Sequence, residues 1–442
     1  MQELVSKLKN RDLYLNQLIA FRDTEPVKVI TGIRRCGKSS LLKLMANHLR
    51  LTGISEDRII EMNFESMTYR GYDAITLYHN IKQRIPEGKK VYLFLDEIQH
   101  VSEWQDAVNS FRVDFPCDIY LTGSNAYLLS SELATYLAGR MIEIKMYPLS
   151  FREFIEFHGF SIKESKSSIG ESRKRIFDAN NEPFEPQEFF EAYLKFGGMP
   201  GIGDVGFVQD KALILLEGIY STVVVRDILE REKRKDERQI TNPDLLRKII
   251  LFLADNIGNS TSMTSIGNTL VHEGLLDEGP RKSKPAVQTI QSYVHALLDS
   301  YVFYEIKRFD IKGKEQLRTL GKYYIVDTGL RNFLLGFRGD DTGHVLENIV
   351  YFELLRRGYD VAVGKVLEKE IDFIATKASE KKYIQVTESM RSPETREREL
   401  APLRMVHDSF TKIVITMDRD VEQTSDGIQI IKLLDFLMAD YE

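Results

Sequence analysis

The residues with the clearest chemical potential form a glycine-rich loop that ends in a lysine and a serine. The loop reads Gly32-Ile33-Arg34-Arg35-Cys36-Gly37-Lys38-Ser39, and Ser40 follows it. Glycines let the backbone N–H groups of such a loop turn inward around phosphate oxygens, and the start of a following helix adds a partial positive charge. A lysine can then reach the terminal phosphates and a serine hydroxyl can bind Mg²⁺. The pattern therefore predicts a cradle for a nucleoside triphosphate.

The elements on either side of the loop support this interpretation. The apolar run of residues 27–31 precedes it, and residues 40–49 follow with the spacing of an amphipathic helix. A strand, a loop and a helix in this order are the context that the motif requires, which makes an incidental glycine-rich turn the weaker alternative.

Two acidic residues extend the predicted site. Asp96 and Glu97 come directly after the apolar run of residues 91–95. A carboxylate at the end of a strand beside the loop can hold Mg²⁺ through water, the role expected of Asp96. Glu97 is placed to polarise an attacking water. The alternative is a solvated strand end, which the preceding loop motif disfavours.

The loop and the acids belong to a stretch in which short apolar runs alternate with helical patterns. The runs predict a parallel sheet covered on both faces, in an α/β fold. They cover residues 27–30, 59–62, 91–95 and 118–121. Residues 151–235 then become helical, with a polar insert at about 161–185, and the polar, glycine-containing stretch 337–343 is the clearest linker candidate.

Composition and charge exclude several classes of protein. The 442 residues are too many for one hydrophobic core, and 43% hydrophobic with 29% charged residues is ordinary for a globular protein. A net charge of −6 excludes a basic nucleic-acid coat, so any DNA-binding surface is expected to be local. Two cysteines exclude a disulfide scaffold, and the chain shows neither a signal peptide nor a membrane-length apolar run. We expect a cytoplasmic protein.

The motifs together resemble a family of prokaryotic AAA-type P-loop ATPases related to origin-recognition and STAND-type ATPases. The resemblance runs over almost the whole chain, through GIRRCGKSSLL, YLFLDEIQ, LTGSNAYLL, LAGR, MYPLSFREF, FGGMPGI, STVVVRDILER and HVLENIVYFELLRRGYDV. It implies ATP and Mg²⁺ as cofactors. It also implies an AAA-type core over residues 1–160, a helical lid over 161–237, a winged-helix domain over 238–336 and a nuclease-like domain of the PD-(D/E)xK kind over 342–442.

The resemblance gives roles to three more residues. It implies that Asn125, or Ser124, contacts the γ-phosphate or the water, although a simple strand-ending turn is nearly as good an explanation for Ser124. Arg140 is a candidate for neutralising transition-state charge, from a neighbouring subunit, which would require an oligomer. Pro200 in Gly198-Met199-Pro200 matches a lid motif whose proline packs near adenine, whereas the sequence alone indicates only a turn.

The sequence predicts three helices, at residues 243–256, opening at 262–266, and at 284–298. It then predicts a β-hairpin over residues 301–327. This is the winged-helix layout, in which the third helix reads a DNA groove. A module that packs against protein and a set of solvated charges are the alternatives. The candidate DNA contacts near the third helix and the hairpin are Lys282, Lys284, Gln288, Lys312 and Lys314.

The last hundred residues resemble a nuclease fold that has lost part of its site. Glu347 and Asp372 match the early acids, but the triplet acid-x-Lys reads Gln385-Val386-Thr387. Gln brings no charge and Thr cannot clamp phosphate, so we expect a vestigial nuclease site without cleavage. Glu388 is one position late and should face the other side of the strand. Lys365 or Lys369 as a relocated catalytic lysine is the dissenting interpretation.

Three hypotheses for function follow. The first is an ATPase that couples its nucleotide state to DNA binding or remodelling, as an oligomer. The second is a STAND-like switch that hydrolyses ATP slowly and recruits a protein partner. The third is an ATP-dependent nuclease.

Overall fold

The computed structural model describes residues 8–123, 139–166, 172–206, 208–223, 228, 240, 242–272, 285–313, 315–338, 341–420 and 422–441. The chain divides into two compact units. The first runs to Tyr147 and includes Asp299–Tyr301, and the second comprises Pro148–Leu298 and Val302–Glu442. Among the described helices, none combines the length and the apolar sequence that a membrane crossing requires.

The first unit is built on a parallel sheet of five strands in the order β2-β3-β4-β1-β5. The predicted parallel sheet is thus confirmed, with a fifth strand at its edge that the apolar runs did not indicate. The strands are β1 (Val27–Thr31), β2 (Ile59–Asn63), β3 (Val91–Asp96), β4 (Cys117–Thr122) and β5 (Met141–Lys145).

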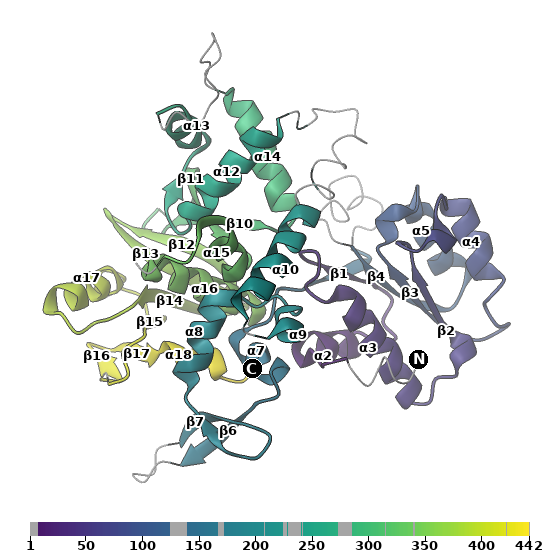
Figure 1. Cartoon of the computed structure of the whole chain (residues 1–442), viewed down its shortest axis with the longest axis horizontal. Coiled ribbons are helices and arrows are strands. Elements are labelled where there is room, and N and C mark those ends of the chain that lie inside the picture. The colour runs from purple at the N-terminus through teal and green to yellow at the C-terminus, as the bar shows by residue number, and fades with distance from the viewer. Residues whose placement is uncertain are drawn as a thin grey trace. The chain divides into compact units, whose positions relative to one another are not determined.

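Helices cover both faces of this sheet, as Figure 1 shows, with α2 and α3 packed together on one side and α4 and α5 on the other. Every residue of β1 and β3 is buried, which explains why these strands are apolar runs without alternation. The helices are α2 (Asp12–Ala20), α3 (Lys38–Leu51), α4 (Ala74–Lys82) and α5 (Trp104–Asp114).

The second unit begins with helices and a small antiparallel sheet. Helix α7 (Phe151–Phe157) opens with a capping box made by Ser150 and Glu153. The polar insert then folds as three strands in the order β6-β7-β8. These are β6 (Ser161–Lys166), β7 (Ser172–Phe177) and β8 (Pro183–Phe184), followed by helices α8 (Pro186–Phe196), α9 (Ile202–Val205) and α10 (Gln209–Ser221).

A three-helix module with a hairpin comes next in the chain. It comprises α12 (Pro243–Asp255), β9 (Ser260–Thr261), α13 (Met263–His272), α14 (Val287–Asp299), β10 (Phe303–Asp310) and β11 (Glu315–Ile325). The short strand β9 pairs with β11, and β10 and β11 form the hairpin. Helix α15 (Thr328–Leu335) follows and packs against α8.

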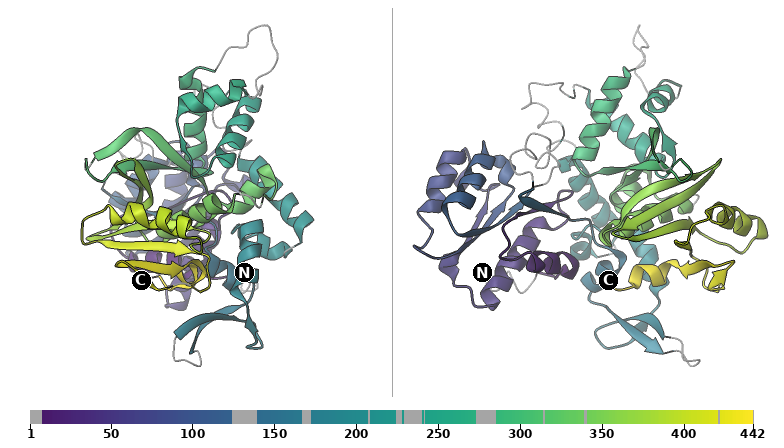
Figure 2. Two further views of the ribbon diagram at one scale, coloured as in Figure 1. Left: turned by 90° about the vertical axis from the view of Figure 1, so that its left-hand side faces the viewer. Right: turned by 180° about the vertical axis from the view of Figure 1, so that it is seen from behind.

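The remaining elements complete a mixed sheet of nine strands in the order β16-β17-β15-β14-β13-β12-β10-β11-β9. Figure 2 shows this sheet from two further sides. The added elements are α16 (Thr342–Arg356), β12 (Asp360–Val366), β13 (Lys369–Lys377), β14 (Glu380–Thr387), α17 (Pro393–Arg404), β15 (Thr411–Thr416), β16 (Thr424–Ser425), β17 (Ile428–Lys432) and α18 (Leu433–Met438).

The expected domain ends do not coincide with this organisation. The hairpin joins the C-terminal strands directly, because Arg308 of β10 pairs with Val363 of β12 in parallel register. The stretch 337–343 therefore connects two helices and does not separate two sheets. The first unit also ends at Tyr147, before the expected end at residue 160.

Candidate functional site

The glycine-rich loop leaves β1 and enters α3 in a conformation that only glycine adopts easily. Gly32 has φ of 139° and Gly37 has φ of 105°. A Cβ atom on Gly32 would lie 2.1 Å from the carbonyl oxygen of Met146, so this position has no room for a side chain. The two glycines of the motif thus serve both the turn and its close packing.

Lys38 is the first residue of α3 and is buried. Its ammonium donates hydrogen bonds to the carbonyl oxygens of Gly32 (2.9 Å) and Ile33 (3.1 Å). Each bond turns the lysine back across the loop, so its charge lies where a phosphate would enter. Arg34 at the loop's rim pairs with Glu65 at 3.1 Å.

Asp96, at the carboxyl end of β3, is hydrogen-bonded to residues at the carboxyl ends of β2 and β4 and at the start of α3. Its Oδ1 accepts hydrogen bonds from Ser39 Oγ (3.1 Å) and Thr122 Oγ1 (2.5 Å), and its Oδ2 accepts one from Asn63 Nδ2 (2.8 Å). Burial raises the pKa of Asp96 above its usual value. Asn63 and Thr122 were missed in the sequence, although each is a polar residue that ends a strand of the sheet.

The residues around Asp96 fit a bound Mg²⁺. The Ser39 hydroxyl and the Asp96 carboxylate are the hard oxygen donors that Mg²⁺ prefers, and it commonly takes few protein ligands when phosphates and water complete its shell. Within the described part of the chain, no three His, Cys, Asp or Glu side chains gather to hold a metal ion by themselves. The donors thus suit a cation that arrives with a phosphate ligand.

Glu97 is held rigidly beside Asp96. Its backbone N–H donates to Thr122 Oγ1 at 2.9 Å, its carboxylate accepts a hydrogen bond from Gln99 Nε2, and its φ is 54°. Burial alone would raise the pKa of Glu97, but the charge of Lys38 and the bond from Gln99 contribute to an overall lowering. The group is therefore an ionised carboxylate at neutral pH.

Within the described part of the first unit, Arg140 is a predicted residue that lies away from this cluster. Arg140 precedes β5, and its carbonyl accepts a hydrogen bond from Val27 N (2.9 Å) at the start of β1. The loop follows the other end of β1, roughly 15 Å away at the rise of a strand. Pro200 belongs to the second unit, and Asn125 and Ser124 lie outside the described residues.

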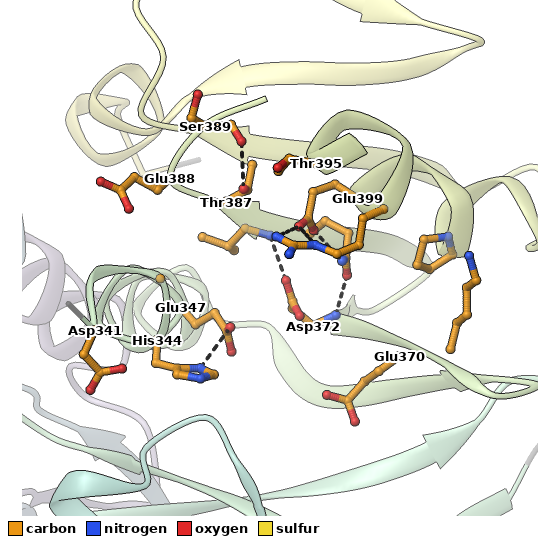
Figure 3. Close-up of a pocket in the computed structure, with 16 residues that line it drawn as sticks. Asp341, His344, Glu347, Glu370, Asp372, Thr387, Glu388, Ser389, Thr395 and Glu399 are labelled. Carbon is orange, nitrogen blue, oxygen red and sulfur yellow. Dashed lines mark hydrogen bonds and ion pairs between the residues drawn. The ribbon is translucent and has the colours of Figure 1, made fainter. Parts of the chain in front are cut away.

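The second unit holds a cavity of about 930 Å³ that is lined mainly by polar side chains. Figure 3 shows Glu347 from α16 and Asp372 from β13 at this cavity, with Glu399 from α17 nearby. Gln385 from β14 also lines it, so the three vestigial residues predicted from sequence converge in one place. Glu388 lines it too, contrary to expectation, because β14 ends at Thr387 and strand alternation stops there.

Gln385 uses both ends of its amide. Its Oε1 accepts the backbone N–H of Asp372 at 2.7 Å, and its Nε2 donates to Glu399 Oε2 at 3.0 Å. A glutamate here could not donate the second bond. Glu399, which the sequence reasoning missed, thus brings a carboxylate next to the position where the nuclease pattern expects an acid.

A buried lysine adds positive charge near these acids. Lys322 on β11 places its Nζ 2.6 Å from Glu370 Oε1 and 3.7 Å from Glu347 Oε2. Burial alone would lower the pKa of Lys322, but Glu347, Asp372 and Glu370 more than offset it. Burial also raises the pKa of Asp372 well above its usual range. Lys322 was not predicted, because the hairpin was assigned to another domain.

Of the candidate DNA contacts, Gln288 and Lys312 are described and exposed. Gln288 lies in the first turn of α14. Lys312 lies in the turn between β10 and β11, where Asp310 Oδ1 accepts the N–H groups of Lys312 and Gly313 at 2.9 Å each. Lys282, Lys284 and Lys314 lie outside the described residues.

Two domain families match the chain. Residues 24–155 match an AAA domain (AAA_14), and residues 187–341 match a domain of unknown function (DUF8612). The first match covers the glycine-rich loop and all five strands of the parallel sheet.

Two relatives and a solved structure are also similar. A Haemophilus influenzae protein described as uncharacterized is 41% identical over 97% of this chain and 98% of its own length. A Methanocaldococcus jannaschii protein, also described as uncharacterized, is 30% identical over 89% of this chain and 80% of its own length. A Walker-type ATPase of Pyrococcus abyssi matches with a TM-score of 0.48 and 17% identity, over 74% of this chain and 95% of that one. The chain therefore belongs to the family of the Haemophilus and Methanocaldococcus proteins and carries an AAA domain of the P-loop ATPase type.

Proposed function

We propose that this protein binds and hydrolyses ATP at the loop of residues 32–40 and couples the state of that site to DNA binding. The observation that carries the first part is the hydrogen bond between Ser39 of the loop and Asp96 at the end of β3. It brings together the hydroxyl and the carboxylate that a Mg²⁺–nucleotide complex needs.

Each residue of the cluster has a role in this proposal. The loop amides of residues 32–40 bind the phosphates, and Lys38 exchanges its two carbonyl partners for the β- and γ-phosphates. Glu97, ionised and fixed by its backbone bond to Thr122, orients the attacking water. Mg²⁺, held through Ser39 and Asp96, supplies charge neutralisation when it is bound.

Arg140 fits this site only from a neighbouring copy of the chain. In its own unit it lies at the opposite end of the sheet from Lys38. We therefore propose an oligomer in which Arg140 of one copy approaches the phosphates bound by the next. Asn125 as a γ-phosphate or water contact and Pro200 as an adenine contact remain part of the proposal.

The DNA part of the proposal rests on the module of α12, α13, α14 and the β10–β11 hairpin. Three helices and a hairpin with a short third strand are the elements of a winged helix. Gln288 at the start of the third helix and Lys312 at the hairpin turn are both exposed, as groove and backbone contacts would be.

We propose that the cavity around Glu347 and Asp372 is a nuclease-like site that does not cleave DNA. Gln385 crosslinks the backbone of Asp372 to Glu399, so both ends of its amide are already bonded. Lys322 places a permanent positive charge against Glu347 and Glu370. A divalent cation would have to compete with that ammonium for the same carboxylates.

The test is the rate of ATP hydrolysis with and without single-stranded, double-stranded and branched DNA. We expect turnover that requires Mg²⁺, rises with DNA and is lost in Lys38→Ala. Unchanged hydrolysis in Lys38→Ala would refute the site. Hydrolysis with no DNA affinity at low salt would refute the coupling and favour a switch that acts on a protein partner.

A further inference from the structure

The peptide that leaves the first unit is packed directly against the glycine-rich loop. Met146 N donates to Thr31 O at 2.8 Å, and Cys36 Sγ lies 3.5 Å from Met146 O. The carbonyl of Met146 also fills the space that a Cβ on Gly32 would need. A change in the loop's backbone therefore cannot leave Met146 where it is.

Arg11 ties the same two segments together through its guanidinium. Nη1 donates to Cys36 O at 3.1 Å and Nη2 donates to Tyr147 O at 2.9 Å. The residue is 3% exposed, and its guanidinium lies over the Tyr14 ring at 4.9 Å. Tyr14 in turn accepts the backbone N–H of Tyr147 at 3.1 Å. One side chain thus holds a loop carbonyl and a carbonyl of the exit peptide at once.

Leu149, two residues further along, is held just as firmly within the second unit. Leu149 N donates to Gly198 O at 2.7 Å, and Leu149 O accepts Tyr193 Oη at 2.8 Å. Gly198 has no room for a Cβ, which would lie 2.3 Å from Leu149 O. Its N–H donates to the buried Asp327 at 2.6 Å.

Residues 146–149 are therefore a continuous segment, called the strap below. Its first two residues are hydrogen-bonded within the first unit, and Leu149 is hydrogen-bonded within the second. We propose that Arg11 is the positioning residue that couples the glycine-rich loop to this strap, so that occupation of the loop by ATP is passed to the segment of Gly198 and Asp327. This inference rests on the proposed ATP site.

The chemistry of the loop explains why such a residue is needed. For the loop amides to face a phosphate, loop carbonyls must face away from it. The carbonyl of Cys36 is held by the Arg11 guanidinium. A guanidinium can donate to two carbonyls at once in a fixed planar geometry, whereas an ammonium is a compact point charge without that geometry. The exit peptide and the loop are thus positioned by the same group.

The test uses the full chain and three amide protons whose bonds report on the strap. These are the N–H groups of Tyr147, Leu149 and Gly198. Hydrogen exchange at each is followed without nucleotide and with saturating ATP, together with direct binding of a fluorescent ATP analogue. The variants are Arg11→Met and Arg11→Lys, with Arg22→Met as the control, because Arg22 pairs with Asp23 and Thr52 instead.

We expect ATP to change exchange at all three amides in the wild type and in Arg22→Met by about threefold or more. Arg11→Met should show no change at Leu149 and Gly198 even with its site saturated, and Arg11→Lys should recover part of the effect. An unaltered response in Arg11→Met, or a wild type that binds ATP without any change at Leu149 and Gly198, would overturn the coupling. A wild type that binds no ATP analogue would instead overturn the proposed function, and the coupling with it.

Discussion

The hydroxyl of Ser39 donates a 3.1 Å hydrogen bond to Asp96, although 57 residues separate the two in the chain. The strand order explains the meeting. Asp96 ends β3, the loop follows β1, and β4 lies between them with Thr122 at its end. Thr122 bonds the same carboxylate oxygen as Ser39. Parallel strands thus bring the polar ends of separate segments to one edge, where a phosphate-bound cation can be held.

Asp96→Asn should make ATP turnover lose most of its dependence on Mg²⁺. The amide keeps an oxygen for Ser39 but brings no charge to a cation, so we expect a fall in kcat of about 100-fold or more with ATP binding largely kept. Turnover against Mg²⁺ concentration measures this. Asp57→Asn is the control, because Asp57 is exposed and pairs with Lys89. A kcat within twofold of wild type would contradict the assignment.

Glu97 should act as a carboxylate over the whole neutral range. Its pKa lies below the usual 4.5, so it stays ionised as pH falls and protonates only in more acidic solution. We therefore expect kcat to show no acid limb between pH 8 and about pH 5. Glu97→Gln should bind ATP and fail to hydrolyse it. An acid limb in the wild-type kcat profile centred near about pH 6.5 would contradict a lowered pKa for Glu97.

The sequence predicts the parallel sheet because buried strands are unbroken apolar runs, and it predicts the loop because the motif is local. It does not predict Arg11, Lys322 or Glu399, since each acts on residues far from it in the chain. The polar insert at 161–185 gave no strand signal, yet it pairs as β6, β7 and β8. The stretch 337–343 has a linker's composition, but the pairing of β10 with β12 joins the segments on both sides of it into one sheet.

Lys312→Ala should weaken DNA binding by the same factor for unrelated sequences. Lys312 is exposed at the hairpin turn, where we expect a lysine to contact phosphate and not base edges. We expect the slope of log affinity against log salt to fall by about 1, the loss of one phosphate contact. Fluorescence anisotropy over a salt series measures it. Lys211→Ala on the exposed side of α10 is the control. Equal slopes in the two variants would show that Lys312 does not contact DNA.

Supercoiled plasmid should survive incubation with the protein, ATP and either Mg²⁺ or Mn²⁺. The amide of Gln385 is already bonded at both ends, and Lys322 pairs with Glu347 and Glu370. Gel electrophoresis over several hours checks this expectation. Cleavage that is lost in both Asp372→Asn and Glu399→Gln would show that Glu399 replaces the missing acid, and the nuclease hypothesis would then stand.

Lys322→Met should destabilise the second unit, because it removes a buried cation from Glu347 and Glu370 and leaves them only their pairs with His344 and Arg308. The Lys322 side chain is 5% exposed and those of Glu347 and Glu370 are 11% and 32% exposed. Removing one partner of a buried pair costs about 3–5 kcal/mol, and Glu370 can relieve part of this by turning toward water. We expect a loss of roughly 2–3 kcal/mol and a fall in Tm of about 5 °C, measured by calorimetry.

The double variant Lys322→Met/Glu347→Gln separates charge from packing. The amide introduced by Glu347→Gln has no charge to leave unpaired, and its oxygen could still accept the bond that Tyr324 Oη donates to Glu347 at 3.0 Å. The double variant should therefore recover a large part of the lost Tm. Lys369→Met is the matched control, because Lys369 lines the same cavity but is exposed, and it should leave Tm nearly unchanged. If Lys322→Met behaves like Lys369→Met, the ammonium is not what holds these carboxylates in the fold.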